Sequence, residues 1–419
     1  MTGFFLRRKK LGDNTGLPSR RLICKGNMAS MTRPLHPFWS AAALICTLAA
    51  PALGHAADDG AALRTAVDAV IRPLMAAHDV PGMAVAVTVD GRVSYFNYGL
   101  ASRATKSAVS EHTLFELGSI SKTFAATLAT YAQEQGMLSL ADHPGAWLQA
   151  LKGSALDRAT LLQLGTYTAG GLPLQMPDEV DDLAQAMRYF QGWEPQAAPG
   201  TVRRYSNPSL GLFGYVAALA MKRDFAGAAE DILFPQLGLR HTYIKVPASA
   251  QGNYAWGYNR DNQAIRVNPG VFDGEAYGAK SSTADMIRYL QANIDPSRLA
   301  APMRRAVEAT HVGHFDMGPM VQGLGWEQYP YPVTLNRLLE GNSEQMLREA
   351  NPARPLAAGA AKGARLFNKT GSTGGFGGYV LFVPEKKIGI VILANRNYPI
   401  PERVKAGYAI LQQLPAAGY

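Results

Sequence analysis

The chain has 419 residues, of which 47% are hydrophobic and 17% are charged, and its formal net charge is +9. This composition excludes a disordered or low-complexity chain and leaves room for one or two globular domains. Residues 1–56 carry eight Lys and Arg side chains against a single Asp, so most of the excess charge belongs to this leader. The rest of the chain is close to neutral and does not favour nucleic acid or a membrane surface as a partner.

The N-terminal region has the order of an export signal. One arginine is followed by an apolar run over 38–48 and by small residues over 49–57. A positive charge, an apolar run too short to span a bilayer and a small-residue stretch are typical of a secretory signal peptide. We therefore expect a signal peptide over 28–56, cleavage after Ala56 and a periplasmic protein.

The leader and the cysteine positions indicate where the chain starts and what the mature protein contains. Residues 1–27 are basic and hold no apolar run, so we expect translation to start at Met28 or Met31; a cytoplasmic extension is the alternative. Cys24 and Cys46 both precede the expected cut, so the mature chain would have neither a disulfide nor a thiol nucleophile. The residue before Cys46 is not small, which argues against a lipid anchor, and we expect no membrane anchor after processing.

Hydrophobic periodicity predicts a helix and a hairpin at the start of the mature chain. Apolar residues recur at helical spacing over 60–78, which indicates an amphipathic helix. Two apolar segments, 83–89 and 92–98, flank the dipeptide Asp90-Gly91. This pair tolerates the positive φ angles of a two-residue hairpin turn.

The C-terminal end repeats this pattern. Segments 378–383 and 388–394 predict a second strand pair, and 402–413 predicts a closing helix. The segment between the two ends is mostly helical. We therefore expect an α/β (α+β) fold in which the N- and C-terminal segments form one antiparallel sheet flanked by helices, with a mostly helical region inserted. The expected catalytic domain, 57–419, divides into an α/β part over about 57–121 and 244–419 and a helical part over about 122–243.

The first motif that carries chemistry is Ser119-Ile-Ser-Lys122, which opens a helical run. Residues three apart share one helix face, so the hydroxyl and the amine would be neighbours. The positive end of the helix dipole favours negative charge at the serine, and a buried lysine at that end has its neutral form favoured. Such a lysine could take the hydroxyl proton. Alone, the motif is also typical of an N-cap serine followed by a solvated lysine.

Two further motifs follow. In Tyr205-Ser-Asn207 a phenol could shuttle protons beside a lysine, and the amide could hold a substrate carbonyl. The alternative is a purely structural role, with a loop tyrosine followed by an N-cap asparagine. Lys369-Thr-Gly-Ser372 leads into a glycine-rich strand. On an edge strand beside a cleft its glycine would allow close backbone approach, and the lysine and threonine could then bind a carboxylate. The alternative is a structural role, in which the motif is only the polar start of a strand and its lysine is solvated.

In this order the three motifs resemble the penicillin-recognising serine enzymes, the β-lactamases and the peptidoglycan D,D-peptidases, and imply their fold. The middle motif begins with Tyr205, as in class C β-lactamases of the AmpC type, whereas class A enzymes have Ser-Asp-Asn. Further stretches similar to class C enzymes cover nearly all of the mature chain: 162–175, 254–258, 275–280, 322–326 and 369–377.

The resemblance implies hydrolysis of cephalosporins and penicillins through a serine acyl-enzyme, conferring β-lactam resistance. Ser119 would be the nucleophile. Lys122 and Tyr205 would move its proton, and the sequence leaves open which of them is the base. The backbone N–H groups of Ser119 and Ser372 would form the oxyanion hole, each worth roughly 3 kcal/mol in the transition state. No cofactor or metal is expected, and the protein would be a monomer that binds small-molecule β-lactams.

The resemblance also implies substrate contacts. Gln175 and Asn207 would contact the acylamide side chain, with Tyr277 as a wall. Lys369 and Thr370 would face the substrate carboxylate, with Arg403 behind them. The other expected substrate-binding positions are Gly371, Ser372 and Asn397. One departure is visible: where many relatives have an asparagine that helps to bind the carboxylate, this chain has Ile400.

Other functions fit the sequence less well. His311, His314 and Asp316 loosely resemble zinc ligands, but the other histidines are scattered and a catalytic zinc needs three well-placed ligands. A D,D-carboxypeptidase would use the same serine but deacylate slowly. A carboxylesterase of this superfamily often lacks an intact Lys-Thr-Gly, which is present here. A sensor that keeps the acyl group is usually joined to a membrane segment.

Overall fold

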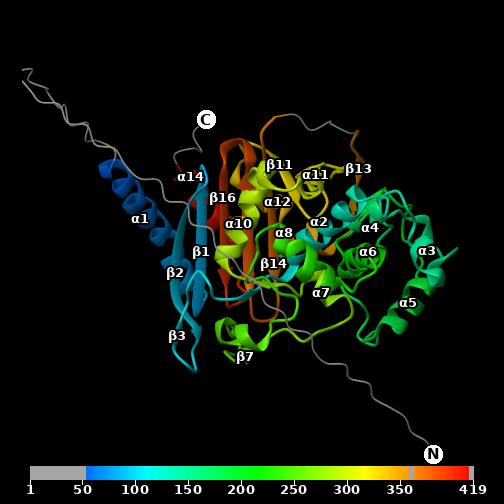
Figure 1. The fold of residues 1–419 in the computed structure, drawn as a ribbon, viewed down its shortest axis with the longest axis horizontal. Helices are drawn as coiled ribbons and strands as arrows, with labels where there is room; N and C mark the ends of the chain where they lie inside the picture. The colour runs from blue at the N-terminus through cyan, green and yellow to red at the C-terminus, as the bar shows by residue number, and fades with distance from the viewer. Residues whose placement is uncertain (1–52, 358–362, 415–419) are drawn as a thin grey trace, which may run out of the picture. The chain divides into compact units, whose positions relative to one another are not determined.

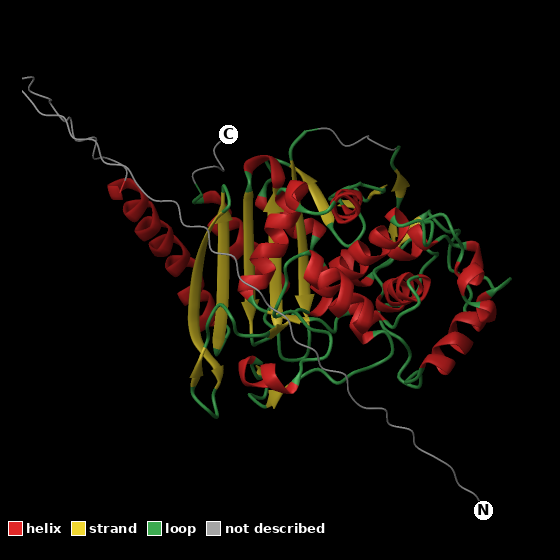
Figure 2. Ribbon diagram, in the orientation of Figure 1, coloured by secondary structure: helices red, strands yellow, loops and turns green. Residues whose placement is uncertain are grey.

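A ten-stranded sheet is the framework of the protein, whose computed structural model describes residues 53–357 and 363–414. All its described pairings are antiparallel, and Figure 2 shows helices beside both faces. In spatial order the strands are β13 (Arg354–Pro355), β9 (Phe315–Asp316), β10 (Val321–Gln322), β11 (Glu327–Pro330), β14 (Arg365–Ser372), β15 (Gly377–Val383), β16 (Ile388–Ala394), β1 (Gly82–Val89), β2 (Arg92–Ser102) and β3 (Ser107–Ala108).

The two ends of the described chain meet within this sheet. Strand β1 pairs with β16, so that Val85 lies opposite Ile392, and β1 also forms a hairpin with β2. The hairpin turn has positive φ at Asp90 (50°) and Gly91 (80°), as the dipeptide predicts. The predicted antiparallel sheet from the N- and C-terminal segments is therefore confirmed, although β2 continues to Ser102.

Side-chain alternation assigns each face of the sheet to its own helices. On β1 the odd positions Met83, Val85 and Val87 pack into a core with α1 (Leu53–Ala77) and α14 (Ile400–Gln412). The even positions Ala84 and Ala86 face the opposite core, where α10 (Thr283–Ile294) covers the sheet. Each large aliphatic side chain buried in this way contributes about 1.5–3 kcal/mol.

The terminal helices begin earlier than the periodicity predicts. Helix α1 begins at Leu53 instead of residue 60, so the expected cleavage after Ala56 falls within its first turn. Helix α14 begins at Ile400, and Pro401 lies in its first turn, where the missing N–H costs no hydrogen bond. The rest of the expected signal peptide and the basic leader lie outside the described residues.

The region between the sheet-forming ends is helical, as predicted. Figure 1 shows its helices, cyan to green, beside the sheet. They are α2 (Ser121–Glu134), α3 (Pro144–Trp147), α4 (Leu161–Gly165), α5 (Leu183–Gly192), α6 (Asn207–Ala220), α7 (Phe225–Ala228) and α8 (Phe234–Gln236). Eleven of the 14 residues of α2 are buried, so this helix lies in the interior, against α6 and α11 (Ala301–Thr310).

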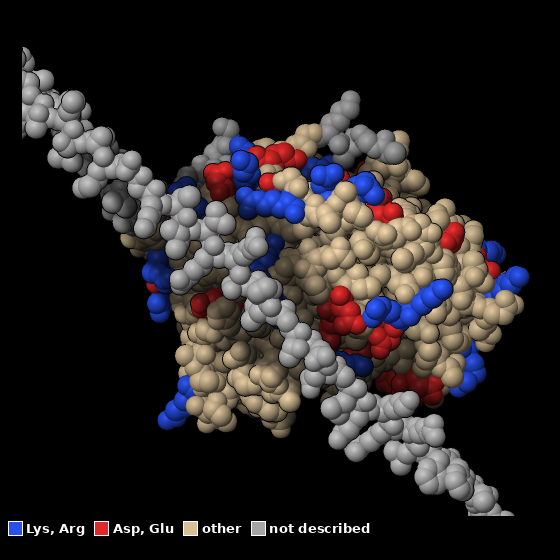
Figure 3. All heavy atoms as spheres, in the orientation of Figure 1, with Lys and Arg blue, Asp and Glu red and all other residues tan. Residues whose placement is uncertain are grey.

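The other α-helices and strands of the described residues are short. They are α9 (Asp273–Ala276), α12 (Leu335–Gly341), α13 (Glu344–Arg348), and the strand pairs β4 (Phe115–Glu116) with β8 (Lys280–Ser281), β5 (Val202–Arg203) with β12 (Asn351–Pro352), and β6 (Gly257–Tyr258) with β7 (Ala264–Ile265). Among the described helices none is both long and apolar enough to cross a membrane. Over the described residues visible in Figure 3, basic and acidic side chains are interspersed.

A core substitution tests whether α1 belongs to the folded domain. Ile71 is fully buried in the core shared with α14, whereas the side chain of Arg72 is 66% exposed. We expect Ile71→Ala to lower the free energy of unfolding by about 2–5 kcal/mol, because it leaves a cavity, and Arg72→Ala to change it by less than about 0.5 kcal/mol. Urea unfolding measures both, and equal effects would contradict the packing.

Candidate active site

Ser119 lies where the chain enters α2. It is the middle residue of a single 3₁₀ turn, Gly118–Ile120, which leads directly into the helix, as expected for a serine at a helix N-terminus. Gly118 has φ +52°, and a Cβ there would collide with the backbone of Ser372. The glycine thus permits the serine loop to lie directly against strand β14. Ser119 is half-buried and lines a cavity of about 330 Å³.

Lys122 lies one turn further along α2 and is fully buried. Its Nζ donates to Ser119 Oγ (3.0 Å), to Asn207 Oδ1 (2.5 Å) and to the carbonyl oxygen of Ala276 (2.6 Å). An ammonium has three N–H donors, so these three acceptors saturate it. Burial lowers the pKa of Lys122 to about 8, the direction expected from the sequence. At neutral pH the lysine is still mostly an ammonium, which has no lone pair to accept the serine proton.

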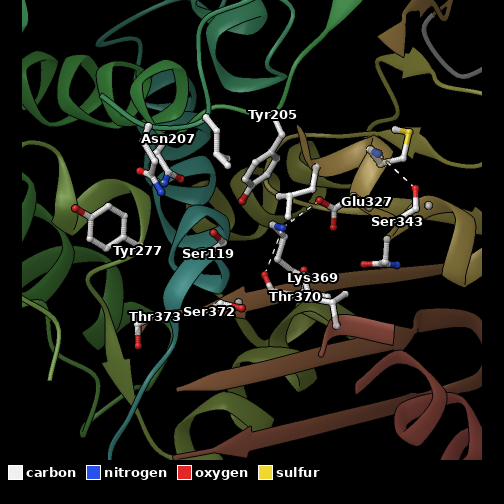
Figure 4. Close-up of a pocket in the computed structure, with 18 of the residues that line it drawn as sticks. Ser119, Tyr205, Asn207, Tyr277, Glu327, Ser343, Lys369, Thr370, Ser372 and Thr373 are labelled. Carbon is white, nitrogen blue, oxygen red and sulfur yellow. Dashed lines mark hydrogen bonds and ion pairs between the residues drawn. The ribbon is translucent and has the colours of Figure 1, made fainter. Parts of the chain in front are cut away.

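Tyr205 is buried beside both lysines of the site. The Nζ atoms of Lys122 and Lys369 each lie 5.1 Å from the centroid of its ring. Burial by itself raises the pKa of Tyr205, but the positive charges of the two lysines outweigh this effect, and the pKa is lowered below its ordinary value. Figure 4 shows the Tyr205 hydroxyl pointing toward Ser119, so the phenol lies near the proton that it would have to accept.

Tyr205 is supported by a second tyrosine. The ring centroid of Tyr167 lies 4.7 Å from that of Tyr205, and the Arg203 guanidinium lies over both rings. Tyr167 is buried in the left-handed backbone region, with φ +62°, a conformation unusual for a tyrosine. Such a conformation persists only where the surroundings enforce it, so the packing of this pair is tightly determined.

Lys369 is paired with a buried carboxylate that sequence reasoning missed. Its Nζ lies 3.1 Å from Glu327 Oε1, and the two side chains are only 3% and 6% exposed. Burial alone would lower the pKa of Lys369, but the negative charge of Glu327 outweighs it and the pKa is raised. The positive charge of Lys369 is thus partly neutralised before any substrate arrives. Glu327 on β11 lies opposite Asn368, the neighbour of Lys369 on β14, so the pairing of these two strands brings the carboxylate near the lysine.

Strand β14 carries the third motif along the cavity. Thr370, Gly371 and Ser372 all line it. A Cβ at position 371 would collide with the carbonyl oxygen of Leu117, so the glycine allows the strand to lie against the segment before Ser119. The close backbone approach at this glycine is as predicted, but the expected edge strand was wrong, because β14 is paired with β11 on one side and with β15 on the other.

The expected acylamide side of the cavity is also assembled. Asn207 donates from Nδ2 to Gln175 Oε1 at 2.8 Å, so this amide joins Gln175 to Lys122. Tyr277 lines the same cavity, and Figure 4 shows it on the side of Ser119 opposite Glu327. Three sequence-predicted residues, from loops and helices far apart in the chain, are therefore brought together.

Two expected substrate-binding residues do not line the cavity. Arg403 is fully buried, and its Nη1 donates to Gly371 O (2.6 Å) and to Ser372 Oγ (2.9 Å). Asn397 is exposed on the surface, and its Oδ1 accepts from Arg403 Nη2 at 2.6 Å. Arg403 binds β14 and not the cavity, in keeping with its expected place behind Lys369 and Thr370, and Asn397 binds Arg403. Ile400, in contrast, lines the cavity.

The histidine cluster considered as a metal site is dispersed. His311 packs against Phe367 and Phe382, and its Nε2 lies 3.0 Å from Asn293 Oδ1. Burial lowers the pKa of His311 and of His314 to about 4. Within residues 53–357 and 363–414 no group of three or more His, Cys, Asp or Glu side chains is arranged to hold a metal ion.

Several lining residues are not among the predicted site residues. They are Leu174, Arg203, Val267, Glu327, Gly341, Asn342, Ser343, Met346, Leu347, Thr373 and Gly374. Most come from loops whose place is decided only by tertiary packing. Leu174, Thr373 and Gly374 lie inside stretches that resemble class C enzymes, and Glu327 directly follows one, so the resemblance was the available sequence signal for these four residues.

Comparisons with known proteins agree with this geometry. The profile of the β-lactamase family matches residues 67–414. The chain belongs to the β-lactamase family. A β-lactamase from Pseudomonas fluorescens is 50% identical to it over 353 residues, which cover 84% of this chain and 99% of the relative.

Solved structures of the family share the fold. A structure described as a β-lactamase/D-alanine carboxypeptidase from Pseudomonas syringae has a TM-score of 0.82 at 48% identity and covers 84% of this chain and 99% of its own. A class C β-lactamase in complex with cefoxitin has a TM-score of 0.82 at 46% identity, and the match covers 85% of this chain and 100% of that structure's chain. These neighbours place the chain among class C β-lactamases and the β-lactamase/D-alanine carboxypeptidase fold.

Helix α9 ties this β-lactamase site to a buried acid. Ala276 offers its carbonyl to Lys122, and the preceding Glu275 is almost fully buried. Burial raises the pKa of Glu275 to about 8 from an ordinary value of 4.5. Between these two pH values the folded state holds a proton that the unfolded state has lost, so stability falls as pH rises through this window.

Glu275→Gln removes this pH dependence. The amide keeps the uncharged shape, so we expect the wild type to lose about 4 kcal/mol more unfolding free energy than the variant between about pH 5 and pH 8.5. Urea unfolding at both pH values measures this difference. The exposed Glu179→Gln serves as the control and is expected to follow the wild type. Parallel pH profiles for Glu275→Gln and the wild type would show that Glu275 is ionised in the folded protein.

Proposed function

We propose that this protein hydrolyses the β-lactam amide of cephalosporins and penicillins, with Ser119 as the acylated nucleophile. The observation that carries this proposal is the three-acceptor cage around Lys122, one of whose acceptors is Ser119 Oγ at 3.0 Å. A fully satisfied ammonium holds the serine oxygen in place and stabilises negative charge as it develops. The same cage argues that Lys122 is not the base.

Tyr205 takes the serine proton in this proposal. Its pKa is lowered by Lys122 and Lys369, so its phenolate is accessible at a lower pH than that of an ordinary tyrosine. The protonated Tyr205 can then give the proton to the leaving nitrogen, and can later deprotonate the water that hydrolyses the acyl-enzyme. The choice that the sequence left open between the two residues therefore falls on Tyr205.

The backbone N–H groups of Ser119 and Ser372 form the oxyanion hole. The contact between Gly118 and Ser372 supports this role, because it brings the two segments together without an intervening side chain. Arg403 holds the Ser372 side from behind through Gly371 O. Each backbone donor of this kind contributes roughly 3 kcal/mol to transition-state stabilisation.

Gln175, Asn207 and Tyr277 bind the acylamide side chain. On the other side, Thr370 and Lys369 bind the substrate carboxylate. Ile400 lines the cavity without a polar atom, and Glu327 already neutralises part of the charge of Lys369. Binding of the carboxylate therefore depends strongly on the Thr370 hydroxyl.

The same proposal covers processing and assembly. Residues 28–56 act as a signal peptide, 1–27 lie upstream of the start, and the mature domain over 57–419 is a periplasmic monomer without cofactor or metal. Its α/β part spans about 57–121 and 244–419, with the helical part between them. The apolar run over 38–48 in the sequence supports export.

D-alanine carboxypeptidase activity is the second candidate. It is favoured by the description of the Pseudomonas syringae structure, which names both activities. The two reactions share the nucleophile and acylation, and they differ in how fast water attacks the acyl-enzyme.

Turnover of a chromogenic cephalosporin by the purified protein tests the proposal. We expect sustained multiple turnover, and Ser119→Ala should lower kcat by about 10⁴-fold or more, because the nucleophile is lost. Thermal unfolding of the variant should match the wild type. A single stoichiometric burst without further turnover would mean that acylation occurs but deacylation does not. It would favour the carboxypeptidase, and a D-Ala-D-Ala peptide would be the next substrate to test. Absence of both burst and turnover would refute the β-lactamase reaction.

Glu327→Gln tests the protonation scheme. Glu327 raises the pKa of both Tyr205 and Lys122, so its neutralisation lowers both values. We expect both limbs of the pH profile of kcat/KM to move toward lower pH by about one unit. The exposed Glu308→Gln, with the same change in charge, should leave the profile in place. An unmoved profile for Glu327→Gln would exclude Tyr205 and Lys122 as the groups that set it.

A further inference from the structure

Glu116 is a buried carboxylate that the catalytic scheme does not use. It ends strand β4, three residues before Ser119, and its residue is 2% exposed. Its Oε1 accepts from the Tyr254 hydroxyl (2.6 Å) and from the backbone N–H of Val267 (2.7 Å), and its Oε2 accepts from Thr373 Oγ1 (2.5 Å). All three donors are neutral groups.

Nearby positive groups are engaged elsewhere. Lys280 lies opposite Glu116 in the β4–β8 pairing, but its Nζ donates to Ile244 O at 3.0 Å. The Arg266 guanidinium packs over the Tyr254 ring, 3.7 Å from its centroid. A buried carboxylate that is held by hydrogen bonds is costly to desolvate, and short charge-assisted bonds compensate only where their geometry is well defined. The positions of the three donors are therefore closely specified.

Two of these donors belong to the cavity wall. Val267 and Thr373 both line the cavity that contains Ser119, although they come from segments more than a hundred residues apart. Figure 4 shows Thr373 on the Tyr277 side of Ser119, away from Glu327. Thr373 also directly follows Ser372 of the proposed oxyanion hole. One carboxylate thus joins the two walls of the acylamide side to the segment that carries the nucleophile.

We propose that Glu116 is a positioning residue that sets substrate selectivity, because its carboxylate holds Thr373 and Val267 together as a rigid wall for the acylamide side chain. The inference rests on the proposed β-lactamase function. Preorganisation of a wall lowers the ordering cost only for substrates large enough to contact it. The effect therefore falls on large side chains and not on the reacting amide.

The test compares two cephalosporins that share ring system and leaving group and differ only in the size of the acylamide side chain. We expect Glu116→Ala to lower the ratio of kcat/KM for the large over the small substrate about tenfold, mainly through KM, as for loss of one charge-assisted hydrogen bond. Glu116→Gln keeps one acceptor for Tyr254 and Val267 and offers an N–H₂ to Thr373, so it should restore most of the ratio.

Glu230 provides the matched control. Its Oε1 also accepts two backbone N–H groups, those of Ile244 (2.7 Å) and Lys245 (2.8 Å), but it does not line the cavity. Glu230→Ala should lower thermal stability and leave the selectivity ratio unchanged. If Glu116→Ala lowers kcat/KM by the same factor for both substrates, Glu116 is merely structural and the inference is overturned.

A second variant protects the test against misfolding. If Glu116→Ala does not fold, Thr373→Val removes one of the three bonds at nearly constant volume and should shift the ratio in the same direction by a smaller factor; an unchanged ratio would overturn the inference. A wild type that turns over neither cephalosporin would refute the proposed function and, with it, this inference. An active wild type with an unaltered ratio in the variants would refute the inference alone.

Discussion

The burial of the Lys122 ammonium is the constraint on which the site depends. A charge taken out of water is costly unless every donor finds an acceptor. Here the acceptors come from the serine turn, from α6 and from α9, so three segments must be in place before the lysine is satisfied. The need to satisfy all three donors of Lys122 therefore also fixes the positions of Ser119 and Asn207 around its Nζ.

The sheet supplies the other half of the site through glycines. Gly118 and Gly371 are close to the backbone of the opposing segment, where any Cβ would collide. Strand β14 is in turn supported from behind by Arg403, which binds Gly371 O and Ser372 Oγ. The proposed oxyanion hole thus needs no mobile side chain, in keeping with electrostatic preorganisation.

The sequence predicted the parts of this protein that depend on local pattern. The two apolar segments on either side of Asp90-Gly91 predicted the hairpin, and Ser119 with Lys122 at helical spacing predicted the first contact of the site. Glu327 could not be predicted, because its place beside Lys369 depends on the pairing of β11 with β14, two strands far apart in the sequence. The sequence placed Arg403 behind Lys369 and Thr370, but its hydrogen bonds to Gly371 O and Ser372 Oγ depend on tertiary packing.

The buried cations and the buried carboxylate of this site have opposite effects on the pKa of Tyr205. Lys122 and Lys369 both lower the pKa of Tyr205, whereas Glu327 opposes them and binds Lys369. Without Glu327, the buried cations Lys122, Lys369 and Arg203 would surround one phenol with no compensating anion, a costly arrangement in a low-dielectric interior. With Glu327 present, the pKa of Tyr205 is still lowered, but by less than the cations alone would lower it. A base that must both accept and return a proton requires such an intermediate pKa, because a strongly stabilised phenolate would not give the proton back.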